Sequence, residues 1–282
     1  MVLTEDLTNQ ICVVTGANAG IGLVTARELA RAGAHVVLAC RSEAKGRAAV
    51  EAIRAEVGSD TVEFLQLDLS DLASVKRASE EFLSKGTPLH LLINNAGLAG
   101  NRGQTVQGFE IQFGVNHLGP FLFTQLLLPA LEKAGSARIV NVASRGHLRA
   151  SGINFGALTS STKSIAGFKE YCVSKLSNVL CSMELAKRLP EGITTYALHP
   201  GVIKSEIWRR IPWPVRPLVT RNMLTVEEGA MTSLHCATSP TLSKDSGRYY
   251  ADCKEAPTNK VATEELALEL WTRSEEWCQE YL

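Results

Sequence analysis

The sequence lacks three features that would assign it to a specialised class of protein. It has no surplus of charge, because 29 Lys and Arg residues balance 29 Asp and Glu residues. Binding to nucleic-acid phosphates needs a basic surplus, so we expect no nucleic-acid partner. No apolar run approaches the roughly 20 residues that span a bilayer, and the acidic residues 1–10 do not match a secretory signal peptide. These absences predict a location in the cytoplasm or on the cytoplasmic face of a membrane.

The cysteines are not arranged as a disulfide framework or a metal site. Their number is odd, and no two have the spacing C-x-x-C; they lie at positions 12, 40, 172, 181, 236, 253 and 278. We therefore expect buried thiols in a reducing compartment and no bound metal.

Short apolar runs alternate with helical patterns along most of the chain. The runs predict strands at 11–16, 35–40, 61–68, 89–97, 137–144, 193–201 and 247–253. Apolar residues at helical spacing predict helices at 21–33, 43–58, 70–86, 167–189 and 259–282, and two helices or one broken helix over 107–134. Ser70 is the expected N-cap of its helix. This alternation, with no linker or low-complexity block, predicts a single doubly wound α/β domain over residues 1–282, with a mostly parallel sheet and helices on both faces.

A glycine-rich turn, TGANAGIG at 15–22, follows the first expected strand. Gly16, Gly20 and Gly22 let the backbone approach a ligand without a Cβ in the way. The first amides of the following helix would then face a phosphate group. The spacing is not that of the G-x-G-x-x-G dinucleotide fingerprint, so a purely structural turn remains the alternative.

Basic residues follow the second expected strand, where an acid would favour NAD. Arg41 and Lys45 stand there, and the first acid is Glu43 in the next helix. Because a guanidinium matches a 2′-phosphate, we expect NADP(H) to be favoured over NAD(H); a solvated surface Arg41 is the alternative. Asp68, at the end of the third strand, could accept a hydrogen bond from adenine or cap the next helix.

Tyr171 and Lys175 lie one helical turn apart in YCVSK. A free tyrosine has a pKa of about 10, which suits proton transfer near neutral pH poorly. A cation on the same helix face would favour the phenolate and lower this pKa. The alternative interpretation is that both side chains lie exposed on the helix surface and have no catalytic role.

Several motifs occur together and in order: TGANAGIG, NNAG (94–97), VNHLGPF (115–121), Ser144, YCVSK and HPG (199–201). This set resembles the short-chain dehydrogenases/reductases over about residues 10–255. Further runs, among them LDLSD (67–71), LHLLINNAG (89–97) and TTYALHPGV (194–202), resemble the retinol dehydrogenase branch. The resemblance implies a Rossmann-type fold, a nicotinamide cofactor and oxidoreductase activity.

The resemblance also implies roles for single residues. Tyr171 would be the general acid in reduction and the base in oxidation, and Lys175 would lower its pKa and hold the nicotinamide ribose. Ser144 would hydrogen-bond the substrate carbonyl, and Asn116 would hold a water molecule connected to Lys175. The implied cofactor contacts are Gly16, Asn18, Gly20, Ile21, Gly22, Arg41, Lys45, Asp68, Leu69, Asn95, Ala96, Gly97, Tyr171, Lys175, Pro200 and Gly201.

Two segments are expected on the substrate side. The insert at 145–170 is longer than most of the family shows, and we predict a loop over the substrate in which His147 is solvated. The segment at about 202–225 interleaves Trp208 and Trp213 with arginines and prolines. We predict a flap that covers an apolar substrate, with contact to a membrane surface or an oligomer interface as alternatives.

The expected function is NADP(H)-dependent interconversion of an apolar, retinol-like alcohol and its aldehyde or ketone. Its partner is then a small apolar substrate, with peripheral membrane contact and a homo-oligomer as further expectations. Two other functions stay open. A nucleotide-sugar epimerase or dehydratase can share the Tyr-Lys pair, and an NADP-binding protein could have these residues without turnover.

Overall fold

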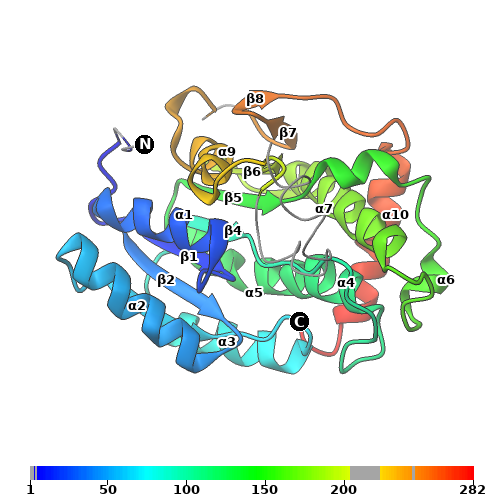
Figure 1. Cartoon of the computed structure of the whole chain (residues 1–282), viewed down its shortest axis with the longest axis horizontal. Coiled ribbons are helices and arrows are strands. Elements are labelled where there is room, and N and C mark those ends of the chain that lie inside the picture. The colour runs from blue at the N-terminus through cyan, green and yellow to red at the C-terminus, as the bar shows by residue number, and fades with distance from the viewer. Residues whose placement is uncertain (1–2, 4, 204–222, 243–244) are drawn as a thin grey trace, which may run out of the picture.

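An eight-stranded sheet runs through the protein in the computed structural model, which describes residues 3, 5–203, 223–242 and 245–282 (Figure 1). The strands are β1 (Ile11–Thr15), β2 (His35–Cys40), β3 (Val62–Gln66), β4 (Leu91–Asn94), β5 (Ala137–Val142), β6 (Ile193–His199), β7 (Arg248–Ala251) and β8 (Lys254–Glu255). Their spatial order is β3-β2-β1-β4-β5-β6-β7-β8. Neighbouring strands are parallel except for the antiparallel β7–β8 pair, which confirms the predicted sheet.

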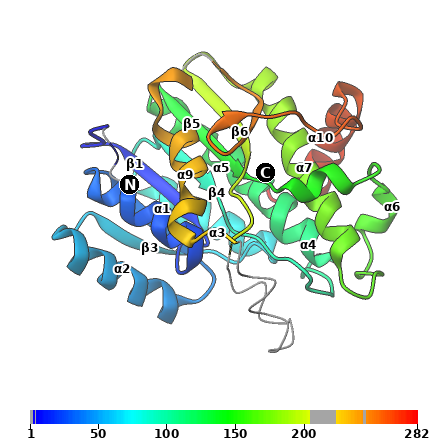
Figure 2. The same ribbon diagram turned by 45° about the horizontal axis from the view of Figure 1, so that its top comes forward.

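Helices cover both faces of the sheet, as Figures 1 and 2 show. One layer contains α1 (Gly20–Arg31), α2 (Glu43–Val57) and α9 (Val226–Thr238). The opposite layer contains α3 (Leu72–Ser84), α5 (Gly119–Lys133), α7 (Phe168–Arg188) and α10 (Glu264–Cys278). Successive side chains of a strand point to opposite faces, so Cys12 and Val14 join the first core while Val13 joins the second. The chain is therefore a single Rossmann-like α/β domain.

Side-chain caps fix several helix starts. The carboxylate of Asp71 accepts a hydrogen bond from the amide of Ala73 at 3.0 Å, so Asp71 caps α3. The prediction of Ser70 as this N-cap was wrong, because Ser70 instead donates to Asp68. Asp71 also accepts a bond from Gln107, whose amide lies 3.3 Å from the hydroxyl of Tyr281 near the C-terminus.

The predicted break near residues 119–120 lies a few residues earlier. The helical stretch begins with α4 (Ile111–Phe113), continues as one π-helical turn, η1 (Gly114–Leu118), and passes directly into α5. Gly119 donates its amide proton to the carbonyl of Gly114, five residues back. The irregularity comes from this shifted hydrogen bond, while Pro120 is tolerated at the start of α5.

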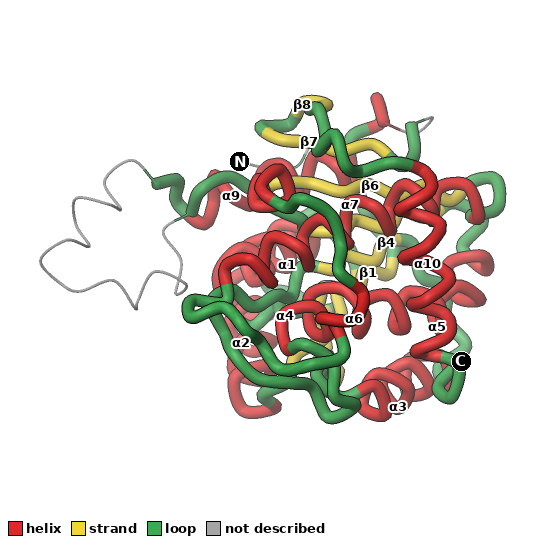
Figure 3. Tube along the Cα trace, turned by 90° about the vertical axis from the view of Figure 1, so that its right-hand side faces the viewer, coloured by secondary structure: helices red, strands yellow, loops and turns green. Residues whose placement is uncertain are grey.

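The insert at 145–170 is more ordered than a loop. It contains a 3-10 helix, η2 (Arg145–Arg149), and the short α6 (Phe155–Leu158), beside α7 and α10 (Figure 3). A further short 3-10 helix, η4, spans Pro240–Leu242. Neither α9 nor β8 was predicted from the sequence.

The final helix is anchored by aromatic residues. The ring of Trp271 lies 4.9 Å from that of Phe121, edge to face, and Trp277 lies 5.7 Å from Phe113. None of the helices in the described ranges is long and apolar enough to cross a membrane.

Candidate functional site

The glycine-rich turn after β1 packs directly against the loop after β4. Gly16 has a φ of +66°, and a Cβ on it would lie 2.9 Å from the Cα of Ala96. A Cβ on Gly22 would lie 2.4 Å from Nδ2 of Asn95 and 2.8 Å from the carbonyl oxygen of Gly16. Asn95 donates from the same Nδ2 to the carbonyl of Thr15 at 2.8 Å. These contacts exclude larger residues at positions 16 and 22.

The N-terminus of α1 carries no competing anion. Its N-cap, Ala19, provides no side-chain hydrogen bond, and the first turn contains no acid. By contrast, side chains cap α2 and α3. Gly20 has a φ of +58°, and a Cβ there would have no neighbour within 4 Å. The first amides of α1 can therefore face a phosphate group, so these residues fit a dinucleotide.

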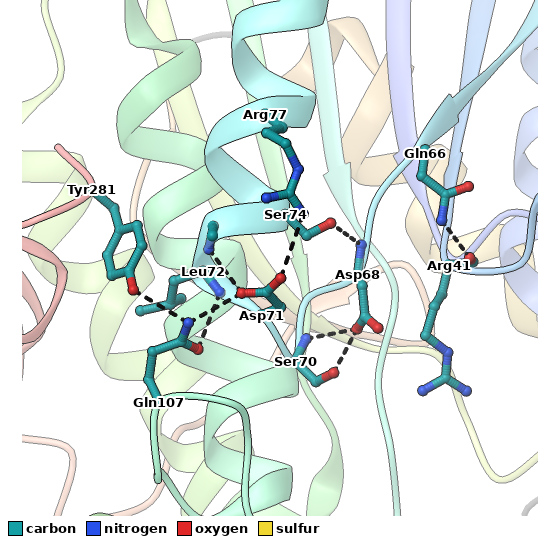
Figure 4. A network of polar contacts seen from close by, with 11 residues as sticks. Arg41, Gln66, Asp68, Ser70, Asp71, Leu72, Ser74, Arg77, Gln107 and Tyr281 are labelled. Atoms are coloured by element: carbon teal, nitrogen blue, oxygen red, sulfur yellow. Dashed lines mark hydrogen bonds and ion pairs between the residues drawn. The ribbon is translucent and has the colours of Figure 1, made fainter.

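The carboxyl ends of β2 and β3 place Arg41 beside Asp68 (Figure 4). Gln66 fixes the backbone by donating to the carbonyl of Arg41 at 2.7 Å, while the Arg41 side chain is exposed. Among the described residues, no carboxylate forms an ion pair with Arg41. Asp68 accepts two hydrogen bonds from Ser70, at 2.9 and 2.6 Å, and does not cap α3. Lys45 is exposed in the first turn of α2.

Further predicted cofactor contacts are Leu69, after β3, and Pro200 with Gly201, after β6. Leu69 is buried, and its carbonyl oxygen would lie 2.6 Å from a Cβ on Gly119, so its side chain belongs to the core. Pro200 and Gly201 follow β6 at the same edge of the sheet as the glycine-rich turn. Gly201 has a φ of +95° and packs against Leu224.

Tyr171 and Lys175 lie side by side on α7, as predicted. The Nζ atom of Lys175 lies 6.0 Å from the centre of the Tyr171 ring. Lys175 is only 4% exposed and donates to the carbonyl of Val142, the last residue of β5, at 2.7 Å. A Cβ on Gly97 would lie 3.3 Å from Nζ and 3.2 Å from Oδ1 of Asn116. The loop after β4 therefore packs against both side chains.

Asn116 lies in the π-helical turn and is buried. Its Oδ1 accepts from the amide of Leu98 at 2.6 Å, and its Nδ2 donates to the carbonyl of Leu98 and to Oγ of Ser174, both at 2.9 Å. Ser174, the serine within YCVSK, was not singled out from the sequence. The Asn116 side chain thus joins the loop after β4 to α7, and π-helical turns often occur at functional sites.

Ser144 follows β5 and lies close to Tyr171. Its Oγ accepts from the amide of Gly146 at 3.0 Å, and a Cβ on Gly146 would lie 3.1 Å from Cε1 of Tyr171. Burial raises the pKa of Tyr171 above its usual value, and the hydrogen bond with Ser144 opposes this shift. The net shift is upward, so the lowering of this pKa by Lys175 stays a prediction. The ammonium group is directed to a backbone carbonyl, and burial dominates.

Burial also acts on the lysine itself. It lowers the pKa of Lys175 to about 8, because its surroundings disfavour the charged form. At neutral pH this lysine remains mostly protonated, so a positive charge is held close to the phenol.

His147 is buried, contrary to the prediction of a solvated histidine. It is 0% exposed, and its Nδ1 lies 2.7 Å from the carbonyl oxygen of Ser144. Its ring meets Tyr249 of β7 edge to face at 4.6 Å. The prediction failed because η2 folds the start of the insert back onto the sheet.

A cavity of about 610 Å³ lies between the insert and α7. Ile153, Leu158 and Val173 contribute apolar walls, and Arg149 contributes a cation. Tyr171 does not line this cavity, but Phe168 does, and the Phe168 ring stacks on that of Tyr171 at 6.2 Å. The predicted flap with Trp208 and Trp213 lies outside the described residues.

The doubly wound sheet, with a glycine-rich turn where the strand order reverses, defines a dinucleotide-binding α/β protein. The chain belongs to the short chain dehydrogenase family, whose model matches residues 10–213. Members of this family are oxidoreductases that use nicotinamide cofactors. Among the described residues, no group of three or more His, Cys, Asp or Glu side chains could hold a metal ion.

Individual relatives are similar over most of the chain. Human retinol dehydrogenase 12 is 46% identical over 270 residues, covering 91% of this chain and 84% of that protein. A crystal structure of an uncharacterised protein from Mycobacterium paratuberculosis has a TM-score of 0.78 and 32% identity, covering 98% of this chain and 95% of that one. The Brucella melitensis 3-ketoacyl-(acyl-carrier-protein) reductase, solved with NADH, has a TM-score of 0.65 and 25% identity, covering 86% and 96%.

The glycine-rich turn yields a test of cofactor binding. In Gly22→Ala, the new Cβ would meet Asn95 at 2.4 Å and displace the turn. We expect the Kd of NAD(P)H, measured from its fluorescence, to rise at least about tenfold. Gly156→Ala is the control, because its Cβ would meet only Asn154 at 3.5 Å. Equal Kd values for the two variants would contradict this account.

Proposed function

We propose that this protein is an NADP(H)-dependent oxidoreductase that interconverts an apolar alcohol and its aldehyde or ketone. The observation that carries the proposal is the pairing of a partly buried Tyr171 with a buried Lys175, next to Ser144, at the carboxyl edge of the sheet. A bound nicotinamide would supply or accept the hydride. The uncapped start of α1 would hold the pyrophosphate, and Lys175 would hold the nicotinamide ribose.

Tyr171 is the proposed proton donor and acceptor. Its raised pKa keeps the phenol protonated at neutral pH, so it can give a proton to a carbonyl oxygen in the reductive direction. The hydroxyl oxygen of Ser144 accepts from the amide of Gly146, and its single proton, which interacts with Tyr171 in the protein alone, would be donated to the carbonyl oxygen when substrate is bound. In oxidation Tyr171 must first lose its proton, so the rate should rise with pH through the pKa of Tyr171.

Asn116 has a supporting role in this proposal. Its side chain binds Leu98 and Ser174, so it holds the loop after β4 against α7 close to Lys175. We propose that it also orients a water molecule through which the lysine exchanges protons with solvent.

The central test is Tyr171→Phe, which removes the phenolic hydroxyl and keeps the ring that stacks on Phe168. We expect turnover to fall by about 10²–10⁴-fold, while the Kd of NADPH changes by less than about threefold. NADPH oxidation would be followed optically with all-trans-retinal, medium-chain aldehydes, steroids and quinones. Tyr281→Phe is the control, since that hydroxyl bonds only to Gln107 among the described residues. Substantial activity in Tyr171→Phe would refute the assigned role.

The class of substrate rests on similarity and on the apolar surroundings of the site. Retinol dehydrogenase 12, at 46% identity, supports a retinol-like alcohol. The flap predicted from the sequence at 202–225 lies mostly outside the described residues, so its test rests on the sequence alone. Trp208→Gln with Trp213→Gln should raise KM for long apolar aldehydes but not for short ones in the same assay. If the protein oxidises NADPH with none of these compounds, the result would instead favour a binding protein or an epimerase.

The preference for NADP(H) is proposed from Arg41. Its side chain is exposed at the end of β2, without a carboxylate partner among the described residues, and is thus available to a 2′-phosphate.

Arg41→Ala should therefore weaken the binding of NADPH and leave the binding of NADH unchanged. Loss of a charge-assisted contact predicts a rise of about ten- to a hundredfold in the Kd of NADPH, with the Kd of NADH unchanged within about twofold. Arg47→Ala is the matched control, because Arg47 is exposed on the adjacent helix and pairs with Glu43. A wild-type preference for NADH, or an Arg41→Ala variant that binds NADPH normally, would overturn the assignment.

Contact with a lipid surface is proposed for the insert. Three large apolar side chains are exposed there, at 49% for Leu148, 92% for Ile165 and 46% for Phe168. Exposed cations accompany them, and Arg149 lies over the Phe168 ring. We define the insert patch as Leu148, Arg149, Lys163, Ile165, Phe168 and Lys169. Apolar residues beside cations suit an anionic membrane surface, from which an apolar substrate could enter the site.

This contact can be measured by flotation with vesicles. We expect the protein to bind phosphatidylserine–phosphatidylcholine vesicles and to bind pure phosphatidylcholine weakly. Lys163→Glu with Lys169→Glu should weaken binding to the anionic vesicles at least about tenfold, because each cation near the surface contributes about 1 kcal/mol. Arg47→Glu with Lys254→Glu, at two exposed positions outside the patch, is the control. Equal binding by both double variants would exclude the insert patch.

A further inference from the structure

We propose that His147 is a positioning residue for Ser144 and that Asn259, in the C-terminal segment, holds this arrangement in place. The inference rests on the proposed function, because it assigns to Ser144 the hydrogen bond to the substrate oxygen. Neither residue contacts the reacting atoms; both act through the backbone of the turn that carries Ser144.

Both oxygens of Ser144 are bound by the turn that follows it. The carbonyl oxygen accepts from Nδ1 of His147 at 2.7 Å and from the His147 amide at 3.1 Å. The hydroxyl oxygen accepts from the amide of Gly146 at 3.0 Å. Because the carbonyl can only accept, the proton of the imidazole is on Nδ1. The ring therefore fixes the peptide of Ser144, while the next amide fixes its hydroxyl.

The surroundings of the ring keep it neutral and hold it in one orientation. His147 is completely buried, and Tyr249 packs edge to face against it. Burial lowers the pKa of His147, so the ring stays an uncharged Nδ1 donor at neutral pH. The charged and titratable groups that face this cluster are His199, Tyr171 and the ion pair of Arg145 with Asp252 at 3.0 Å.

Asn259 fastens the turn from a distant part of the chain. Its Nδ2 donates to the carbonyls of His147 and Ala150, both at 2.7 Å, and its Oδ1 accepts from the amide of Val261 at 3.1 Å. The carbonyl of His147 also accepts from the amide of Ala150 at 3.2 Å, so Asn259 adds a second donor there and joins it to the carbonyl of Ala150, the residue after η2. One side chain before α10 therefore closes the 3-10 helix that carries His147.

Displacing Ser144 should change the pKa of Tyr171, an effect that a loss of stability alone would not produce. The hydrogen bond with Ser144 lowers the pKa of Tyr171 against the effect of burial. If His147 or Asn259 no longer holds the turn, this bond weakens and the pKa of Tyr171 rises. Alcohol oxidation then needs a higher pH, and kcat falls more than the KM of the cofactor changes.

The test compares two amides at position 147. The side-chain amide of Asn can replace the Nδ1 donor, whereas that of Gln extends to the position of Nε2, which has no partner in the described structure. We expect His147→Asn to keep kcat within about threefold of wild type. His147→Gln should lower kcat about three- to tenfold and shift the pH midpoint of alcohol oxidation upward, with cofactor KM unchanged.

A second pair of variants does not alter the core. Asn259→Asp keeps the acceptor for Val261 but removes both donated bonds, so it should shift the pH midpoint in the same direction as His147→Gln. Asn154→Asp is the matched control, because Asn154 is exposed in the same insert and its side chain caps no helix. Thermal unfolding shows which variants are folded, and Asn259→Asp tests the proposal if His147→Gln does not fold.

The outcome can be separated from that of the proposed function. The pKa of Tyr171 is also measurable without turnover, from the ultraviolet absorbance of its phenolate. Each protein is titrated with and without the additional change Tyr171→Phe, and the difference between the two titrations gives the signal of Tyr171. If wild type turns over no carbonyl compound, the proposed function fails, but the phenolate titration still tests the positioning. If Asn259→Asp and folded His147→Gln leave both the Tyr171 pKa and the pH midpoint unchanged, the inference is wrong.

Discussion

The buried ammonium group of Lys175 is the constraint on which the site depends. It donates to the carbonyl of Val142 at 2.7 Å, and Asn178 donates to the same oxygen at 3.3 Å, so α7 is fastened to the end of β5. Burial lowers the pKa of Lys175 to about 8, from an unfolded value of about 10.4. A depressed lysine pKa means that the unfolded chain binds the proton more readily, so stability decreases as pH falls between these values and stays lower below them. The fold thus retains a destabilising charge beside Tyr171.

A chain of buried polar side chains crosses the sheet behind this charge. Asn94 donates to Thr124 at 3.0 Å and to Asn141 at 2.9 Å, and Asn141 donates to Ser182 at 3.0 Å and to Thr195 at 3.3 Å. These bonds join β4, β5 and β6 to α5 and α7. Because buried polar groups are costly when displaced, the chain favours one register of the strands that carry the site residues. The asparagines therefore help to align the sheet edge at which Ser144, Lys175 and the glycine-rich turn meet.

Some parts of the molecule could be predicted from the sequence and others could not. The β-branched runs and glycine stops were sufficient for the first seven strands, and the spacing of Tyr171 and Lys175 was sufficient to place them on one face. The helix at 226–238 was missed although Thr225 and Glu228 form a capping box, a signal that could have identified it. The π-helical turn around Asn116 was missed because a shifted hydrogen bond leaves no mark on apolar periodicity. The two-residue β8 was too short for any pattern.

The sequence by itself determined the order of the elements, the glycines that the nucleotide turn requires and the Tyr–Lys pair, because backbone conformation and helical spacing are local properties. Only the tertiary structure decided the burial of His147, its link to Asn259 and the direction in which the pKa of Tyr171 moves. Burial and hydrogen-bond partners come from segments far apart in the chain. Asn259 lies 112 positions from His147, and no local pattern encodes their contact. The electrostatic balance at the phenol is therefore a property of the packed fold and not of the motif.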